Sequence, residues 1–180
     1  SRPAVVVLTD ASLGNLEDNG SQGGYLVGLM EEGYVGNGTI APISWASKRI
    51  RRVVRSTFAG ETLACVDGID EAIDVANMLY EFECLQKRPK IVAFTDCKSL
   101  FDTVTTVKEP KEKRLKLDIA TIREMLDTGV LADFVWVPSQ WQLADTLTKE
   151  PPCSKLLEVL GTGRLHIPHA CMVYTKKEKK

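Results

Sequence analysis

The sequence lacks the features of a membrane or secreted protein. No apolar run reaches the roughly 18 residues that a bilayer span needs, and no signal-peptide pattern opens the chain. The five cysteines are widely spaced and contain no C-x-x-C pair, which argues against a disulfide framework and against a zinc site. These absences predict a soluble, reduced, intracellular protein.

An excess of charge of one sign is also missing. The chain has 23 Lys and Arg against 24 Asp and Glu, a formal net charge of −1, which by itself suggests no polyanionic partner. The basic residues are nevertheless clustered, and five of them fall in one short stretch: Lys48, Arg49, Arg51, Arg52 and Arg55. Local patches act on phosphates within a Debye length, so the neutral total does not exclude nucleic acid.

What the chain does have is an ordinary globular composition, with 44% apolar and 26% charged residues over 180 positions, which suits one domain. Hydrophobic periodicity predicts strands at about 4–9, 24–31, 39–46, 91–95 and 130–137, and helices at about 57–86, 98–107, 111–127, after 140 and 154–160. This order predicts an α/β fold whose first three strands form an antiparallel meander in a mixed sheet with helices on its faces. Periodicity is lost near the end of the chain, so we expect a domain over residues 1–165 and a basic C-terminal tail or linker over 166–180.

Two predicted strands end in an aspartate, at Leu8-Thr9-Asp10 and at Phe94-Thr95-Asp96. Strand ends in α/β sheets open onto the crevice where ligands bind. Two acids brought together there repel each other unless a cation lies between them, and carboxylate oxygens suit Mg²⁺ or Mn²⁺. For either aspartate alone, a turn former is the better explanation.

Two further acids, Glu61 and Asp145, have simple explanations when they are taken singly. Glu61 could complement the dipole at the start of its helix, and Asp145 could be a solvated charge on a helix face. Together with the aspartates they lie in four ordered motifs: T-D-A-S (9–12), R-S-T-x-A-x-E-T-L-A (55–64), T-D-x-K-S-L (95–100) and W-V-P-S-x-x-Q-L-A-D-x-L-T-K (136–149).

This ordered set closely resembles the ribonuclease H domain of the Pol polyprotein of copia-type (Pseudoviridae) LTR retrotransposons, over about residues 5–165. The resemblance implies a ribonuclease H-like fold, a five-stranded mixed sheet flanked by helices. It also implies a metal-dependent endoribonuclease that cuts the RNA strand of RNA–DNA hybrids during reverse transcription. The four catalytic, metal-binding acids of the family map onto Asp10, Glu61, Asp96 and Asp145.

The implied chemistry uses two Mg²⁺ ions, for which Mn²⁺ can substitute. Two ions about 3.5–4 Å apart clamp the attacking water and the leaving oxygen of a phosphodiester, and the products carry a 5′-phosphate and a 3′-hydroxyl. In this assignment Asp10 bridges the ions, Asp96 and Glu61 lie on the leaving-group side, and Asp145 completes the site that activates water. No other cofactor is implied.

Residues outside the acids are assigned to nucleic acid. Ser12 and Asn15 lie where relatives contact the minor groove of the hybrid, where short polar groups can read the ribose 2′-hydroxyl, although a polar turn explains Asn15 equally well. Lys48, Arg51, Arg52 and Arg55 precede the helix that carries Glu61, which favours contact with the phosphate backbone over the usual solvated face.

Many cellular ribonucleases H carry a histidine in the loop before the last aspartate, and residues 138–142 contain none. The two histidines of the chain, His166 and His169, follow that aspartate and are interpreted as incidental. The resemblance further implies an adjacent reverse transcriptase domain, no membrane partner, and a cytoplasmic location in virus-like particles.

Two other functions remain open. The domain could be a non-catalytic ribonuclease H-like module that binds nucleic acid or connects parts of a polyprotein, or another enzyme of the same fold, such as an integrase. Retention of all four acids favours catalysis, because a structural module has no need to crowd like charges. The G-G-Y (23–25) and Q-L-A-D (142–145) motifs argue against an integrase.

Overall fold

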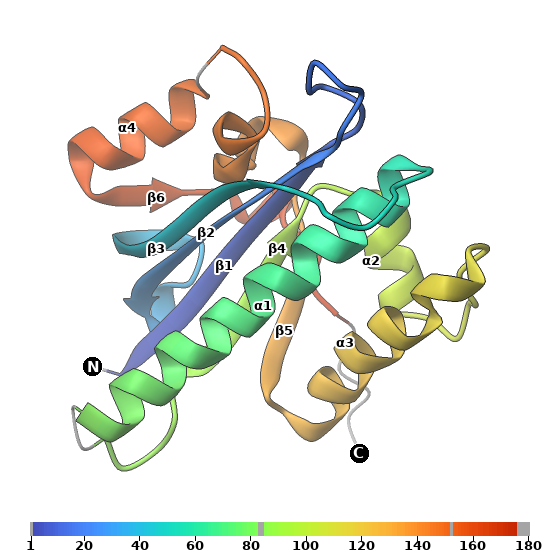
Figure 1. The fold of residues 1–180 in the computed structure, drawn as a ribbon. Coiled ribbons are helices and arrows are strands. Elements are labelled where there is room, and N and C mark those ends of the chain that lie inside the picture. The colour runs from blue at the N-terminus through green and yellow to red at the C-terminus, as the bar shows by residue number, and fades with distance from the viewer. Residues whose placement is uncertain (1, 83–84, 152, 176–180) are drawn as a thin grey trace.

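The structure, a computed structural model, describes residues 2–82, 85–151 and 153–175 as a sheet with helices on both faces (Figure 1). The strands are β1 (Pro3–Ser12), β2 (Gln22–Glu31), β3 (Asn37–Arg49), β4 (Lys90–Thr95), β5 (Leu131–Trp136) and β6 (Arg164–His166). The α-helices are α1 (Thr57–Phe82), α2 (Lys98–Val104), α3 (Lys116–Thr128) and α4 (Ser154–Thr162).

The six strands run in the order β5-β4-β1-β2-β3-β6. β1, β2 and β3 are antiparallel neighbours, β4 and β5 pair in parallel on the other side of β1, and β6 pairs antiparallel with the start of β3. β1 therefore occupies the middle of a mixed sheet, between an antiparallel and a parallel neighbour.

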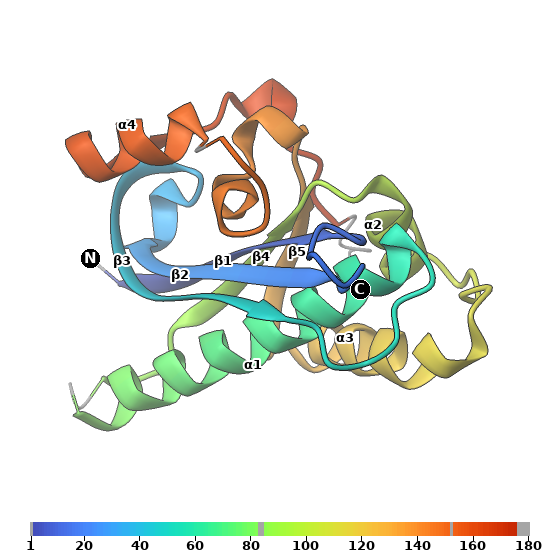
Figure 2. The ribbon, with the colours of Figure 1, turned by 45° about the horizontal axis from the view of Figure 1, so that its top comes forward.

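β1 is apolar on both faces because both faces are covered. Val5 and Val7 belong to a core with α1, α2 and α3, whereas Val6 and Leu8 belong to a second core with α4 and the C-terminal segment. Figure 2 shows α1 and α3 on one side of the sheet and α4 on the other. An unbroken apolar run is typical of a strand buried on both faces, which explains the sequence of β1.

One glycine sets the distance between α1 and the sheet. A Cβ atom at Gly68 would lie 2.5 Å from Thr9 Cγ2 and 3.1 Å from Tyr25 Cβ. Only glycine lets the helix backbone approach β1 this closely. The close approach brings the N-terminal part of α1 against the end of β1.

The predicted mixed sheet, with an antiparallel meander of its first three strands, is confirmed, and it has six strands rather than five. The segment around Asp145 was expected to be an α-helix and is a 3-10 helix, Leu143–Leu147. Trp45, on β3, lies at the surface and is 62% exposed. Among the described helices, none combines the length and apolarity that crossing a membrane requires.

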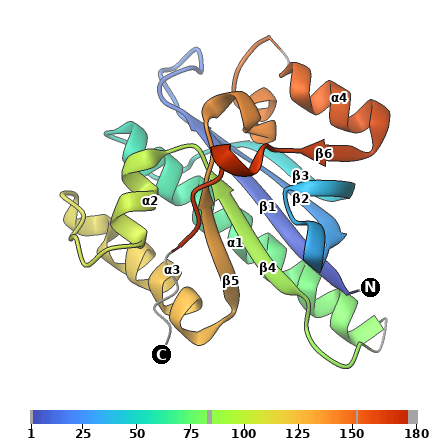
Figure 3. The same ribbon diagram turned by 180° about the vertical axis from the view of Figure 1, so that it is seen from behind.

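The stretch expected to be a tail from residue 166 is folded as far as residue 175. Ile167 is fully buried, Met172 is nearly so, and Val173 exchanges two backbone hydrogen bonds of 2.9 Å with Trp136 in β5. Figure 3 shows this segment running from β6 toward β5 across the face opposite α1. Its apolar residues are irregularly spaced, so they gave no helix or strand period. The predicted basic tail at 176–180 lies outside the described residues.

Candidate active site

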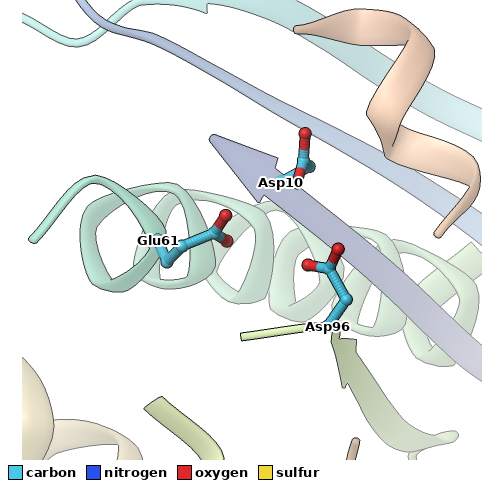
Figure 4. Close-up of side chains that lie close together, drawn as sticks. All are labelled: Asp10, Glu61 and Asp96. Carbon is cyan, nitrogen blue, oxygen red and sulfur yellow. The ribbon is translucent and has the colours of Figure 1, made fainter. Parts of the chain in front are cut away.

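Asp10 and Asp96 meet because their strands are parallel neighbours. Leu8 in β1 is paired with Phe94 in β4, so both strands reach the same edge of the sheet two residues before the two aspartates. Glu61, in the second turn of α1, completes the group, and one carboxylate oxygen from each of the three residues lies within 4.8 Å of the others. Figure 4 shows the three side chains converging from β1, α1 and the residue after β4.

Glu61 is held by the end of β1. Its Oε1 accepts a hydrogen bond of 3.3 Å from the backbone N–H of Ala11. The preceding residue, Gly60, has room for only a small side chain, since a Cβ atom there would lie 3.3 Å from the Cβ of Ala11. Glu61 is only 4% exposed. It is therefore not a surface acid that merely complements the helix dipole.

Burial and mutual repulsion disfavour the charged forms of these acids. Desolvation is the main cause that raises the pKa of Glu61 to about 9, and the negative charges of Asp10 and Asp96 add to it. The pKa of Asp10 is also raised, mainly by burial, although a hydrogen bond from Thr148 and the charge of Lys149 oppose the increase. Asp10 Oδ1 and Glu61 Oε2 are buried without a hydrogen-bond partner. Such orphaned acceptors are expected where a cation binds.

Asp145, the fourth predicted acid, lies beside this group rather than within it. Its Oδ1 is 2.6 Å from Lys149 Nζ, which is also 3.3 Å from Asp10 Oδ2. Thr148 donates a hydrogen bond to the same Asp10 oxygen. The 3-10 helix that carries Asp145 is therefore linked to β1 through the two residues at the end of its own motif.

Sequence reasoning did not assign these supporting residues a role. Buried Gln142 donates a hydrogen bond of 2.8 Å to the carbonyl of Thr9 and accepts one of 3.3 Å from the N–H of Ala144. Gly24, which is paired with Asp10, leaves room for the 3-10 helix that carries Asp145. A Cβ atom at Gly24 would lie 2.7 Å from Leu147 Cβ. The only signal for them was their presence inside the G-G-Y and Q-L-A-D-x-L-T-K motifs.

The two residues predicted to read the ribose lie in the same cleft as the acids. Ser12 and Asn15 line an open cleft of about 430 Å³ together with Asp10, Glu61 and Asp96. Ser12 is buried and its hydroxyl has no partner, whereas Asn15 is exposed. Both positions are compatible with the predicted contact to the minor groove, which stays a prediction.

The predicted phosphate-binding residues are partly brought together. Lys48, Arg51 and Arg52 line a groove of about 420 Å³ between the end of β3, α1 and α3. Lys48 is 3.5 Å from Asp67, and Arg52 is 3.0 Å from Asp118, so acids neutralise part of the basic run. Arg55 is exposed and is not among the residues that line this groove.

The two histidines are engaged elsewhere. His166, on β6, has Nδ1 2.7 Å from Asn37 Oδ1, and the ring of His169 lies 5.9 Å from that of Tyr174. Neither is among the residues that line the carboxylate cleft.

Comparison with solved structures identifies the class of fold. A ribonuclease H1 isolated from compost by a metagenomic approach matches 86% of this chain and 98% of its own, at 18% identity and a TM-score of 0.56. Its complex with an RNA/DNA hybrid gives a TM-score of 0.53 at 17% identity, over 85% of this chain and 99% of that one. The ribonuclease H1 of Halobacterium salinarum covers 81% and 94% of the two chains, at 17% identity and a TM-score of 0.55. The chain therefore has the ribonuclease H-like fold.

Sequence comparison is more specific. The chain is 30% identical over 136 residues, 76% of its length, to the retrovirus-related Pol polyproteins from transposons RE1 and RE2 of Arabidopsis thaliana. It spans 9% of the length of each of these relatives. No protein-family model matches the chain. Sequence thus confirms the resemblance to copia-type retrotransposon Pol polyproteins, and the solved structures confirm the ribonuclease H-like fold.

Proposed function

We propose that this chain is a divalent-metal-dependent ribonuclease H that cleaves the RNA strand of RNA–DNA hybrids, as part of a retrotransposon Pol polyprotein. The observation that carries the proposal is the convergence of Asp10, Glu61 and Asp96 from three separate elements, with oxygens within 4.8 Å, at the edge of a ribonuclease H-like sheet. Three acids crowded together, two of them buried, are costly to the fold unless they serve a cation.

The donor set fits a hard divalent cation. All three groups offer carboxylate oxygens, and two buried oxygens, Asp10 Oδ1 and Glu61 Oε2, have no partner. Oxygen-only sites suit Mg²⁺ or Mn²⁺ rather than Zn²⁺, and on this chemistry we assign Mg²⁺ as the natural ion. Asp10, Glu61 and Asp96 would hold it, and Asp145 would contribute to a second ion.

Each residue has a role in the proposed reaction. Bound divalent ions lower the pKa of an attacking water and stabilise negative charge at a phosphodiester. The acids fix the position of that chemistry at the end of β1, and Gln142 anchors the turn of Asp145 to Thr9 beside it. Ser12 and Asn15 would orient the ribose, and products with a 5′-phosphate and a 3′-hydroxyl belong to this proposal.

The proposed partners follow from the cleft and from the relatives. One solved neighbour is described as a complex with an RNA/DNA hybrid, and the curated relatives are Pol polyproteins. We assign the hybrid as substrate, Lys48, Arg51, Arg52 and Arg55 as phosphate contacts, and a reverse transcriptase domain as a neighbour in the polyprotein. Residues 1–165 are proposed to hold the catalytic unit, which would act in cytoplasmic virus-like particles.

The test is a cleavage assay with Mg²⁺ on an RNA–DNA hybrid, double-stranded RNA and a DNA duplex. We expect cleavage of the hybrid alone. Asp10→Asn and Asp96→Asn should each lower the rate by more than roughly 100-fold, the upper end of what loss of an outer-shell partner costs a metal site. Asp102→Asn is the control, because Asp102 is a half-exposed acid on α2 that pairs with Lys98, and it should cleave at the wild-type rate.

Two results would contradict the proposal. Cleavage by Asp10→Asn at the wild-type rate in saturating Mg²⁺ would remove the carboxylates from the chemistry. Binding of the hybrid without cleavage by the wild-type chain would leave the non-catalytic module as the function.

A further inference from the structure

Lys149 places an ammonium group between two of the proposed metal-binding acids. Its Nζ is 2.6 Å from Asp145 Oδ1 and 3.3 Å from Asp10 Oδ2. Asp145 and Lys149 are four residues apart, and a backbone hydrogen bond of 3.0 Å from the N–H of Lys149 to the carbonyl of Asp145 closes the turn between them. Lys149 therefore occupies a position in which a cation is bridged by two carboxylates.

The surroundings of this ammonium hold an excess of negative charge. Asp10 is fully buried close to Asp96, and Asp145 is the second partner of Lys149, so one ammonium does not balance the three aspartates of the site. One oxygen each of Asp10 and Glu61 remains without a partner. A site whose negative charge is only partly neutralised keeps its acids in position and still attracts a further cation.

The ammonium is also free to leave. The Lys149 side chain is 41% exposed and lines the open cleft, whereas the Asp10 carboxylate that it contacts is fully buried. Thr148 donates to the same Asp10 oxygen, so Asp10 keeps a partner if Lys149 moves. A long, half-exposed lysine can exchange partners without any change in the backbone.

We propose that Lys149 is an internal counter-ion of the active site, which holds Asp10 and Asp145 together in the metal-free protein and is displaced by the divalent cation. The inference rests on the proposed function, since it concerns the same metal site. It makes Lys149 a positioning residue whose charge competes with metal binding. Lys149→Gln should therefore bind Mg²⁺ more tightly than the wild-type protein does.

The experiment measures Mg²⁺ affinity in the absence of substrate, from the rise in melting temperature with Mg²⁺ concentration. We expect the Mg²⁺ concentration at half-effect to fall on the order of fivefold in Lys149→Gln, the size of a partly exposed ion pair. Lys149→Arg keeps the charge and should stay close to wild type. Lys155→Gln is the matched control. Lys155 Nζ is 3.1 Å from Glu158 Oε2, and this pair does not include any of the proposed metal-binding acids.

A second measurement uses the wild-type protein and does not depend on the stability of a variant. The side-chain ammonium signal of Lys149 in the NMR spectrum should shift with Mg²⁺ at the same midpoint as the melting temperature, while that of Lys155 stays unchanged. Two results would overturn the proposal that Lys149 is a counter-ion. One is an unshifted Lys149 signal, and the other is an unchanged or weaker Mg²⁺ affinity in Lys149→Gln.

Failure of the proposed function gives a different result. If the wild-type protein shows no Mg²⁺-dependent stabilisation, the metal site and the counter-ion are both wrong. If Lys149→Gln binds Mg²⁺ more tightly but the wild-type chain cleaves no hybrid, the counter-ion stands and the ribonuclease activity fails.

Discussion

Glu61 is an acid whose burial opposes its ionisation. Its pKa is raised from 4.5 to about 9, first by desolvation and then by Asp10 and Asp96. An acid whose pKa is raised on folding stabilises the fold fully below its unfolded pKa, and this contribution is lost as the pH rises through the folded value. In the metal-free protein, the contribution of Glu61 to the free energy of unfolding should therefore decrease from about pH 4.5 to about pH 9.

We predict that Glu61→Gln stabilises the metal-free protein at pH 7, raising the melting temperature by a few degrees or so. The reason is that Glu61, ionised in the unfolded chain at pH 7, must take up a proton on folding, whereas a neutral amide needs none. Urea unfolding at several pH values between 5 and 9 should also show a flatter pH dependence than wild type. Glu124→Gln, at an exposed position of α3, is the control. A destabilised Glu61→Gln across this range would show that the carboxylate contributes more than its burial costs.

At this scale the sequence predicted the acids but not their support. Asp10 and Asp96 were identifiable because each ends an apolar strand, and Glu61 and Asp145 because they stand in specific motifs. Lys149 and Thr148 could not be assigned in this way. Their contacts with Asp10 join residues 139 and 138 positions apart, and such contacts depend on tertiary packing.

Basic residues gather at the end of β3 and in the segment between β3 and α1. Lys48, Arg51 and Arg52 line one groove, and Arg52 is held by Asp118 and by the carbonyl of Arg114, 3.4 Å away. A fixed arginine loses little conformational freedom when it meets a phosphate. This arrangement supports a role in holding the hybrid's backbone.

We predict that Arg51→Ala, Arg52→Ala and Arg55→Ala together weaken hybrid binding and flatten its salt dependence. Each lost phosphate contact should reduce the slope of log K against log salt by roughly 0.7–0.9. The control removes three basic residues, Arg2, Lys87 and Arg88, which line a pocket near the opposite end of β1. An unchanged slope in the first triple variant would mean that these arginines only face solvent.

Most elements were predicted, including the six-residue strands β4 and β5, whereas β6 and the segment after it were not. The apolar period of α1 and the β-branched run of β1 extend over many residues, so local pattern and tertiary packing agree. β6 has three residues, and the segment after it has no period. These parts are ordered by pairing with residues 37–39 and with Trp136, which no local pattern encodes.

The C-terminal segment connects the two sides of the molecule. After β6 pairs with β3, the chain donates from Ile167 to the carbonyl of Gly36 at 2.8 Å, crosses the sheet, and pairs with β5 through Val173. Trp136, its partner in β5, donates its ring N–H to the carbonyl of Asp96 at 3.0 Å. The segment thus contacts Gly36 beside β3 and Trp136 in β5, and the ring of Trp136 in turn holds the backbone of Asp96, a proposed metal ligand.

We predict that Ile167→Ala lowers the free energy of unfolding by about 2–5 kcal/mol, since Ile167 is fully buried in the second core. His169→Ala, at an exposed position two residues later, should change it by less than about 0.5 kcal/mol. Chemical denaturation measures both. Equal stability of the two variants would mean that the segment only rests on the sheet.

The link between Thr148 and Asp10 has a consequence for how the protein is made. The ribosome adds Asp10 138 residues before the hydroxyl that holds it, a delay of roughly seven to thirty seconds at ordinary rates of synthesis. During that interval β1 has its antiparallel neighbours, but its proposed catalytic carboxylate has neither Thr148 nor Lys149. A nascent chain released early would carry an acidic strand end without its counter-charge, and these contacts become possible only when Thr148 and Lys149, the two residues after the 3-10 helix of Asp145, have been synthesised.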